Sequence, residues 1–123
     1  MNLISSPGTP LKGTAALPGD KSISHRSALF AAIAYGQSRM ENFLDAGVTR
    51  AMLDSLTALG VPWQLEGGTL TVEGRGVQGL KPPDSPLQCG NSGTTIRLLA
   101  GALAAANLPA VLDGSAGLRR RPM

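Results

Sequence analysis

Several residue types that define whole classes of protein are scarce in this sequence of 123 residues. It has one cysteine, Cys89, and one histidine, His25. A single cysteine excludes an intramolecular disulfide and a cysteine-rich metal cluster. Zinc sites combine several cysteine and histidine ligands. We therefore expect no metal site within the chain.

Aromatic residues are also rare, at 3% of the sequence. Proteins that bind single-stranded nucleic acid stack the bases on aromatic side chains, so this composition argues against that class. The net charge is +3, a mild excess that suits an anionic small molecule as well as a polyanion. We expect no nucleic-acid partner.

Long apolar runs are missing, although hydrophobic residues make up 42% and charged residues 15% of the chain. Those fractions are typical of a folded globular domain. No run approaches the length that spans a bilayer, and the start of the chain lacks the basic region and apolar stretch of a signal peptide. We therefore predict a cytoplasmic protein without a membrane partner.

Breaker residues and apolar periodicity predict alternating strands and helices, with helices packed on sheets. The first helix is expected over 24–35, ending at Gly36. The second begins with Thr49 as its N-cap and stops at Gly60. Strands are expected at 3–5, 12–17, 38–44, 61–65, 69–73 and 110–112, with a short one near 77–80. The Gly pair at 67–68 predicts a hairpin between two of them.

The stretch Pro-Gly-Asp-Lys-Ser-Ile-Ser-His-Arg at 18–26 combines a breaker pair with closely spaced polar groups. Serine is a favourable N-cap, so we expect Lys21, Ser22 and Arg26 in the turn before the first helix and in its first turn. Cations are unfavourable there because the helix dipole makes that end positive, whereas a bound anion would offset them. The alternative is a capped helix whose cations reach solvent.

A second stretch, Gly-Asn-Ser-Gly-Thr-Thr-Ile-Arg at 90–97, precedes another apolar helix. Gly93 would let a ligand approach the backbone, and the helix start would offer N–H groups to an anion. The phosphate-binding Walker pattern is excluded because its lysine is absent. A simple Gly/Ser-rich turn that caps a helix is the alternative, and Arg97 could face the same site or solvent.

The third basic stretch is Arg119-Arg120-Arg121, followed by Pro122 and Met123. Three adjacent arginines are more often a solvated or polyanion-binding run than a catalytic one. By itself this stretch therefore indicates no particular chemistry.

Together the segments at 18–26, at 90–99 (Gly-Asn-Ser-Gly-Thr-Thr-Ile-Arg-Leu-Leu) and at 121–123 (Arg-Pro-Met) resemble the 5-enolpyruvylshikimate-3-phosphate synthase family. This family is also called 3-phosphoshikimate 1-carboxyvinyltransferase. The order and spacing of the segments fit, and the first is the most specific. The resemblance covers essentially the whole chain but only the N-terminal part of the family's length.

The resemblance implies transfer of the enolpyruvyl group of phosphoenolpyruvate to the 5-hydroxyl of shikimate 3-phosphate, with release of phosphate and without a cofactor. This step belongs to the shikimate pathway to chorismate and the aromatic amino acids. By the same resemblance, Lys21 would touch both substrates, and Ser22 and Arg26 would bind shikimate 3-phosphate. The residues that would bind or line the phosphoenolpyruvate site are Asn91, Gly93, Thr94 and Arg121.

The family's inhibitor glyphosate occupies the phosphoenolpyruvate position, so Gly93 is expected to govern sensitivity to it. Leu98 departs from the proline that many relatives have at this point.

The family fold is of the α/β (α+β) class, with two lobes that are built from β-α-β-α-β-β units and hold the ligands between them. The resemblance implies that residues 1–19 belong with a C-terminal lobe and that 20–123 form part of the N-terminal lobe. The catalytic acid and base would then lie beyond Met123. We expect either a truncated product, one piece of a split enzyme whose other lobe is a separate chain, or a partial structure, and we expect the isolated chain to be inactive.

Two alternatives stay open at this point. The related enolpyruvyl transferase that acts on UDP-N-acetylglucosamine has an Ala-Lys-Asn-type motif where this chain has Asp20, Lys21 and Ser22, and a reactive cysteine in a later loop. Cys89 lies before the second glycine motif and is better explained as a small buried hydrophobic residue. The second alternative is a non-enzymatic basic fragment that binds polyanions through its arginine run.

Overall fold

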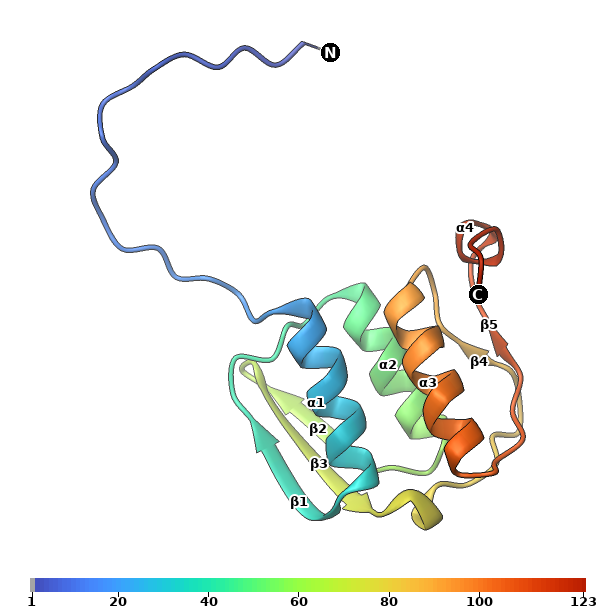
Figure 1. Ribbon diagram of the computed structural model, residues 1–123. Coiled ribbons are helices and arrows are strands. Elements are labelled where there is room, and N and C mark those ends of the chain that lie inside the picture. The colour runs from blue at the N-terminus through green and yellow to red at the C-terminus, as the bar shows by residue number, and fades with distance from the viewer. Residues whose placement is uncertain (1) are drawn as a thin grey trace.

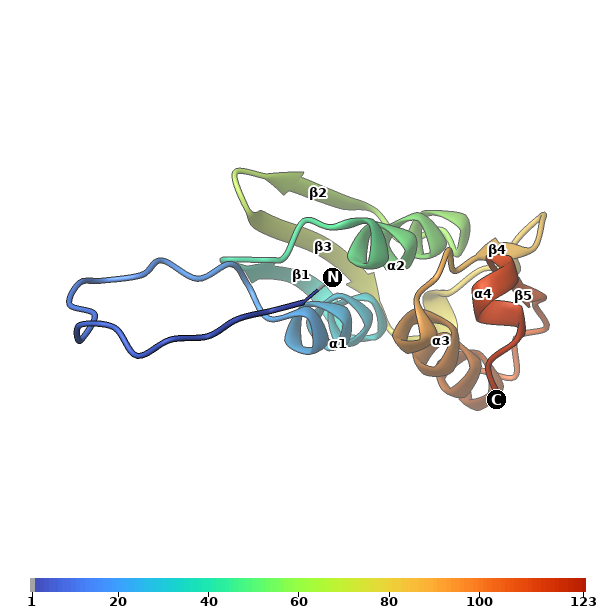
Figure 2. The ribbon, with the colours of Figure 1, turned by 90° about the horizontal axis from the view of Figure 1, so that it is seen from above.

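Three helices pack beside one another, and the first of them packs on a small antiparallel sheet, in this computed structural model, which describes residues 2–123 (Figure 1). The helices are α1 (Lys21–Ile33), α2 (Gly47–Ala58) and α3 (Gly93–Ala105). Helix α1 packs on the central strand of the sheet, and α3 packs against both α1 and α2. Figure 2 shows the helices from above, beside the sheet.

The larger sheet has the order β1-β3-β2 and is antiparallel throughout. Its strands are β1 (Tyr35–Met40), β2 (Trp63–Glu66) and β3 (Thr69–Arg75). Along β3, Leu70 and Val72 are fully buried, and Thr69 and Thr71 alternate with them on the other face, so one face packs on the helices and the other is polar. Gly67 and Gly68 both have positive φ, as a two-residue hairpin turn requires. This confirms the predicted hairpin.

A second, two-stranded parallel sheet pairs β4 (Leu87–Gln88) with β5 (Leu112–Asp113). It is followed by the short helix α4 (Ala116–Arg119), and a 3-10 turn, η1 (Val77–Gly79), leads away from the first sheet. The predicted strand at 77–80 is therefore wrong. Gly76 takes a positive φ and starts the turn, so the backbone leaves the extended conformation there.

Leucine and alanine dominate the single core that joins helices and sheets. One face of α2 lies in this core: Met52, Leu53 and Leu56 are fully buried, and Leu59, which follows the helix, is 1% exposed. Thr49 is not the N-cap, because Ala46 takes that place and the Thr49 hydroxyl accepts from its N–H group at 3.0 Å. Gly60 follows the helix with a φ of +79°, as predicted for its stop.

Helix α1 begins three residues earlier than predicted, because Asp20 rather than a serine is its N-cap. It also ends earlier, at Ile33, since Tyr35 already pairs with Arg75 in the sheet. Strand β1 accordingly occupies 35–40 rather than 38–44, and β5 lies at 112–113 rather than 110–112.

Residues 2–20 lie outside every helix and strand, so the strands predicted at 3–5 and 12–17 are absent. A strand needs a neighbouring backbone for its hydrogen bonds. This segment leads away from the helices and the sheet in Figure 1, and no backbone hydrogen bond joins residues 2–19 to a neighbouring strand. Its large apolar side chains are exposed, from 78% at Leu17 to 100% at Leu11.

Candidate anion-binding site

The three long helices begin at the same edge of the molecule (Figure 1). Helix α1 starts at Lys21, α2 at Gly47 and α3 at Gly93. Each helix start carries N–H groups without an intrahelical partner and the positive end of the helix dipole. Three such ends on one edge form a surface that attracts anions.

The first turn of α1 places cations on this edge. Asp20 caps the helix, and its carboxylate accepts from the N–H of Ile23 at 2.7 Å. Lys21, Ser22 and Arg26 are exposed, and the Arg26 guanidinium donates to the Ser22 carbonyl at 3.1 Å. Across residues 2–123, no acidic side chain forms an ion pair with either cation. Their charges are thus free to meet an anionic ligand.

The first turn of α3 brings two further cations together at Gly93. A methyl group at Gly93 would lie 2.7 Å from Nη1 of Arg97 and 3.1 Å from Nη1 of Arg121. Like charges repel, and within the described part of the chain neither guanidinium has an acidic partner. Two such groups beside one helix start suit a carboxylate or phosphate, which arginine binds with paired hydrogen bonds.

Backbone carbonyls hold the terminal segment in this position. The Arg97 guanidinium donates to the Pro122 carbonyl at 2.7 Å and to the Gly93 carbonyl at 3.3 Å. The N–H of Arg121 donates to the Leu118 carbonyl at 3.0 Å, at the end of α4. Arg97 therefore ties the segment that carries Arg121 to the first turn of α3.

The three adjacent arginines have different environments. Arg119 forms a two-point ion pair with Asp113, and its guanidinium lowers the pKa of that carboxyl to about 2. Arg120 is exposed, whereas Arg121 joins Arg97 beside Gly93. The run is therefore not one uniform basic patch.

Asn91 and Thr94 flank the start of α3. The Asn91 side chain is exposed, and its Oδ1 accepts from the Ser115 hydroxyl at 3.2 Å, which links the glycine-rich turn to the start of α4. Thr94 is half-buried. Both lie at the edge described above, next to Gly93.

The side chain of His25 contacts the starts of α1, α2 and α3. It is a functional candidate that the sequence patterns did not predict. Its imidazole is fully buried. Nδ1 lies 2.7 Å from the Lys21 carbonyl oxygen, and Nε2 lies 3.2 Å from the Ser92 hydroxyl and 3.0 Å from the Val48 carbonyl oxygen. The first and second sequence motifs are therefore in direct contact through one side chain.

Cys89 lies in the core with no exposed surface, as predicted. Burial raises the pKa of its thiol to about 11. A neutral, inaccessible thiol is a poor nucleophile, so Cys89 does not match the reactive cysteine of the alternative family.

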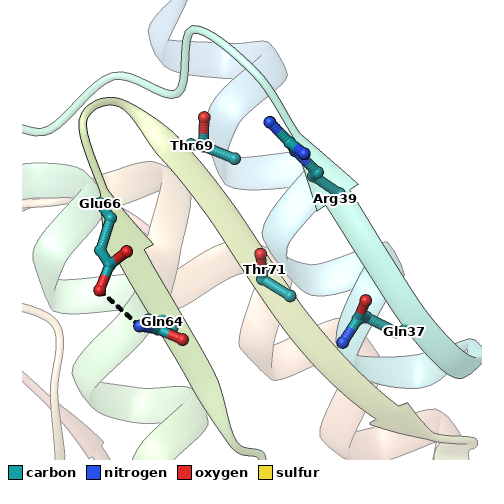
Figure 3. A pocket seen from close by; sticks show the side chains of 6 residues that line it. All are labelled: Gln37, Arg39, Gln64, Glu66, Thr69 and Thr71. Carbon is teal, nitrogen blue, oxygen red and sulfur yellow. Dashed lines mark hydrogen bonds between the residues drawn. The ribbon is translucent and has the colours of Figure 1, made fainter.

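One hollow of the described structure is lined by none of the motif residues. It measures about 480 Å³ and lies on the polar outer face of the β1-β3-β2 sheet (Figure 3). The side chains around it are exposed or half-buried, and Gln64 and Glu66 hydrogen-bond to each other there. A smaller cavity of about 210 Å³ includes Asp113, Arg119 and Arg121 in its lining. The chemistry of the motifs points to the helix edge rather than to the larger hollow.

Residues 2–123 contain no group of three or more potential metal-ligating side chains. Within the same residues, every helix is too short or too polar to cross a membrane.

Comparison with known proteins gives a consistent result. A family model described as EPSP synthase (3-phosphoshikimate 1-carboxyvinyltransferase) matches residues 5–123. A protein of that name from Salinibacter ruber is 49% identical over 114 residues, which are 92% of this chain and 26% of the relative. One from Pelobacter propionicus is 48% identical over 124 residues, covering all of this chain and 29% of the relative.

Solved structures of EPSP synthase from Acinetobacter baumannii superpose with TM-scores of 0.85 and 0.83, at 44% and 43% identity. Each alignment covers 90% of this chain and about a quarter of the solved one. The chain thus spans roughly a quarter of the length of these relatives, and its mixed helix-and-strand fold corresponds to part of an enolpyruvyl transferase lobe. The chain belongs to the EPSP synthase family.

Proposed function

We propose that this chain supplies part of the active site of a 3-phosphoshikimate 1-carboxyvinyltransferase. The enzyme would transfer the enolpyruvyl group of phosphoenolpyruvate to the 5-hydroxyl of shikimate 3-phosphate and release phosphate. The observation that carries this proposal is the meeting of Lys21, Gly93 and Arg121 at one edge where three helices begin. Both substrates bear phosphate and carboxylate groups, which such an edge attracts.

Shikimate 3-phosphate is assigned to the first turn of α1. Ser22 offers a hydroxyl, and Lys21 and Arg26 offer charges without acidic partners among the described side chains. The Arg26 guanidinium already donates a hydrogen bond to the Ser22 carbonyl, so the two residues would bind the ligand together.

Phosphoenolpyruvate is assigned to the first turn of α3. There, Gly93 has no side chain, and the Arg121 guanidinium lies beside it. Asn91 and Thr94 would line the site, and Lys21 would reach the same ligand from α1. Glyphosate would occupy this position as an inhibitor.

The cations of this edge would stabilise negative charge that shifts during addition and elimination. Proton transfer needs an acid and a base, and we place both in the remainder of the enzyme, together with a second set of substrate-binding cations. The reaction as proposed needs no cofactor.

We assign residues 1–19 to the C-terminal lobe of the complete enzyme and 20–123 to the N-terminal lobe. Leu3, Ile4, Leu11 and Leu17 support the first assignment, since each is at least 78% exposed. Four exposed apolar side chains in so short a segment indicate a surface that contacts another part of the protein rather than a solvated tail. Cytoplasmic localisation stays a prediction.

The test uses a completed enzyme, in which residues 1–123 are joined to the C-terminal remainder of the Salinibacter ruber relative. Phosphate release should require both phosphoenolpyruvate and shikimate 3-phosphate, and mass spectrometry should detect the enolpyruvyl product. A folded completed enzyme that converts neither substrate would contradict the proposal, provided that the intact relative is active in the same assay.

A further inference from the structure

Buried polar side chains gather at one end of the helical layer. The buried polar residues of the described chain are Ser24, His25, Thr49, Ser55, Ser92 and Thr95. All except Ser55 lie within the first five residues of α1, α2 or α3 or cap one of these helices. A buried polar group is costly unless it is hydrogen-bonded, so such a concentration indicates a structural or functional requirement at this place.

His25 is the largest member of this group and the one that contacts all three helix starts. Each ring nitrogen of His25 faces a carbonyl oxygen, which can only accept: Nδ1 faces that of Lys21 at 2.7 Å, and Nε2 faces that of Val48 at 3.0 Å. We assign the ring proton to Nδ1, because its contact is the shorter of the two. Nε2 faces the first turn of α2 through the Val48 carbonyl and the cap of α3 through the Ser92 hydroxyl.

The hydrogen bonds of Ser92 complete the connection. Its hydroxyl oxygen accepts from the N–H of Thr95 at 3.1 Å and from the Thr95 hydroxyl at 2.8 Å. Its own proton is then available for Nε2 of His25. Every bonding position of this hydroxyl has a partner, which fixes its orientation and the start of the α3 helix that follows it.

We infer that His25 is a positioning residue for the proposed reaction, because it fixes the backbone of Lys21 and the cap before Gly93 on opposite sides of one imidazole ring. This inference rests on the proposed function. The α1 edge holds shikimate 3-phosphate and the α3 edge holds phosphoenolpyruvate, so His25 sets the distance between the two substrates. Reactions between two bound substrates are sensitive to such displacements.

Two amide substitutions separate the two sides of the ring. In His25→Asn, the side-chain amide reaches the Nδ1 position and keeps the bond to the Lys21 carbonyl but loses the link to Ser92. In His25→Gln, the longer side chain reaches the Nε2 position and keeps the link to Ser92 but loses the bond to Lys21. In the completed enzyme, the Asn variant should raise KM for phosphoenolpyruvate about fivefold with little effect on KM for shikimate 3-phosphate, and the Gln variant should do the reverse.

Ser55→Ala is the matched control. Ser55 is 2% exposed, and its hydroxyl donates only to the Ala51 carbonyl within α2. It should lower the melting temperature and leave both KM values unchanged. If the His25 variants lower stability and the active fraction but change the two KM values equally, His25 is structural only and the inference is wrong.

A measurement without turnover keeps this inference separate from the proposed reaction. Nitrogen NMR of the 123-residue chain should show a protonated Nδ1, and Ser92→Ala should shift the Nε2 signal while Nδ1 stays protonated. An unprotonated Nδ1, or an Nε2 signal that Ser92→Ala leaves unchanged, would refute the hydrogen bonds assigned to His25. This conclusion would hold whatever reaction the complete enzyme performs. If the NMR result holds and the unsubstituted completed enzyme is inactive, the proposed function fails instead.

Discussion

His25 and Ser92 are 67 positions apart in the sequence, yet Nε2 of the first lies 3.2 Å from the hydroxyl of the second. This contact brings the lysine-serine motif and the glycine-rich motif to one edge of the molecule. The proposal that a lysine at the start of α1 and a glycine at the start of α3 contact the same ligand builds on this contact. The predictions below test what this edge binds and what holds it together.

Removing either cation near the start of α1, Lys21 or Arg26, should weaken binding of shikimate 3-phosphate. A hydrogen bond to a charged group contributes about 1.5–3 kcal/mol, so Lys21→Ala and Arg26→Ala should each raise the dissociation constant about 10- to 100-fold in the completed enzyme. Isothermal calorimetry measures this directly. Arg50→Ala is the control, because Arg50 lies in α2 and pairs with Asp45. Unchanged affinity in both α1 variants would refute the assignment.

Gly93→Ala should reduce inhibition by glyphosate more than it reduces affinity for phosphoenolpyruvate. The added methyl group would lie 2.7 Å from the Arg97 guanidinium and 3.1 Å from that of Arg121, so both must shift. Glyphosate is longer than phosphoenolpyruvate and should tolerate this shift less well. The inhibition constant and KM are measured side by side in the completed enzyme, with Gly101→Ala as the control, since a methyl there meets open space. If Gly93→Ala changes neither value, Gly93 only starts the helix.

The 123-residue chain by itself should release phosphate from the two substrates no faster than the background reaction, and it should be marginally stable. Large apolar side chains of α1 and β1 are uncovered, with Ile23 69%, Phe30 59% and Tyr35 83% exposed. A separately produced C-terminal piece should restore turnover and raise the melting temperature. Sustained turnover by residues 1–123 without that piece would show that the site is not shared.

Acid should lower the free energy of unfolding by protonating Asp113 and breaking its ion pair with Arg119. The Arg119 guanidinium holds the pKa of this carboxyl at about 2, below the value of about 3.9 in an unfolded chain. A depressed pKa means that the ion pair stabilises the fold above pH 4 and that this contribution is lost as the pH falls from about 4 to about 2. Arg119→Ala should remove this part of the pH dependence in denaturant unfolding, and Arg120→Ala should not. Identical acid profiles for the parent and Arg119→Ala would contradict the role of the pair.

Cys89 should resist alkylation in the folded chain. Burial raises the pKa of its thiol to about 11, so only about one molecule in a thousand is a thiolate at pH 8. Maleimide labelling followed by mass spectrometry should be slow in buffer and fast in denaturant. Rapid labelling of the folded chain would reopen the comparison with cysteine-dependent enolpyruvyl transferases.

Local sequence patterns predicted the parts of this fold that depend on neighbouring residues. The α2 helix and the hairpin at Gly67 and Gly68 follow from apolar spacing and turn chemistry, and the structure confirms both. The N-terminal strands failed because a strand depends on a partner that these residues do not meet. The early start of α1 was missed because Asp20 and the serines after it are all good caps, and composition does not choose among them.

The candidate site, like the fold, has features that local sequence predicts and features that depend on tertiary contacts. The motifs themselves predicted which residues carry charge and that a helix follows each of the first two motifs. The role of His25 could not be predicted from the sequence, because its partners lie on α2 and at the cap of α3 and no local spacing connects them. The separation of the three arginines, with Arg119 paired to Asp113 and Arg121 beside Gly93, likewise depends on tertiary contacts.

A crystal structure of the completed enzyme with shikimate 3-phosphate and glyphosate tests the central claim most directly. The account predicts that the phosphate of shikimate 3-phosphate contacts Ser22 and Arg26, that Lys21 lies between the two ligands, and that glyphosate lies against Gly93 within reach of Arg121. Ligands bound away from the shared start of α1 and α3, for example on the outer face of the β1-β3-β2 sheet, would contradict it.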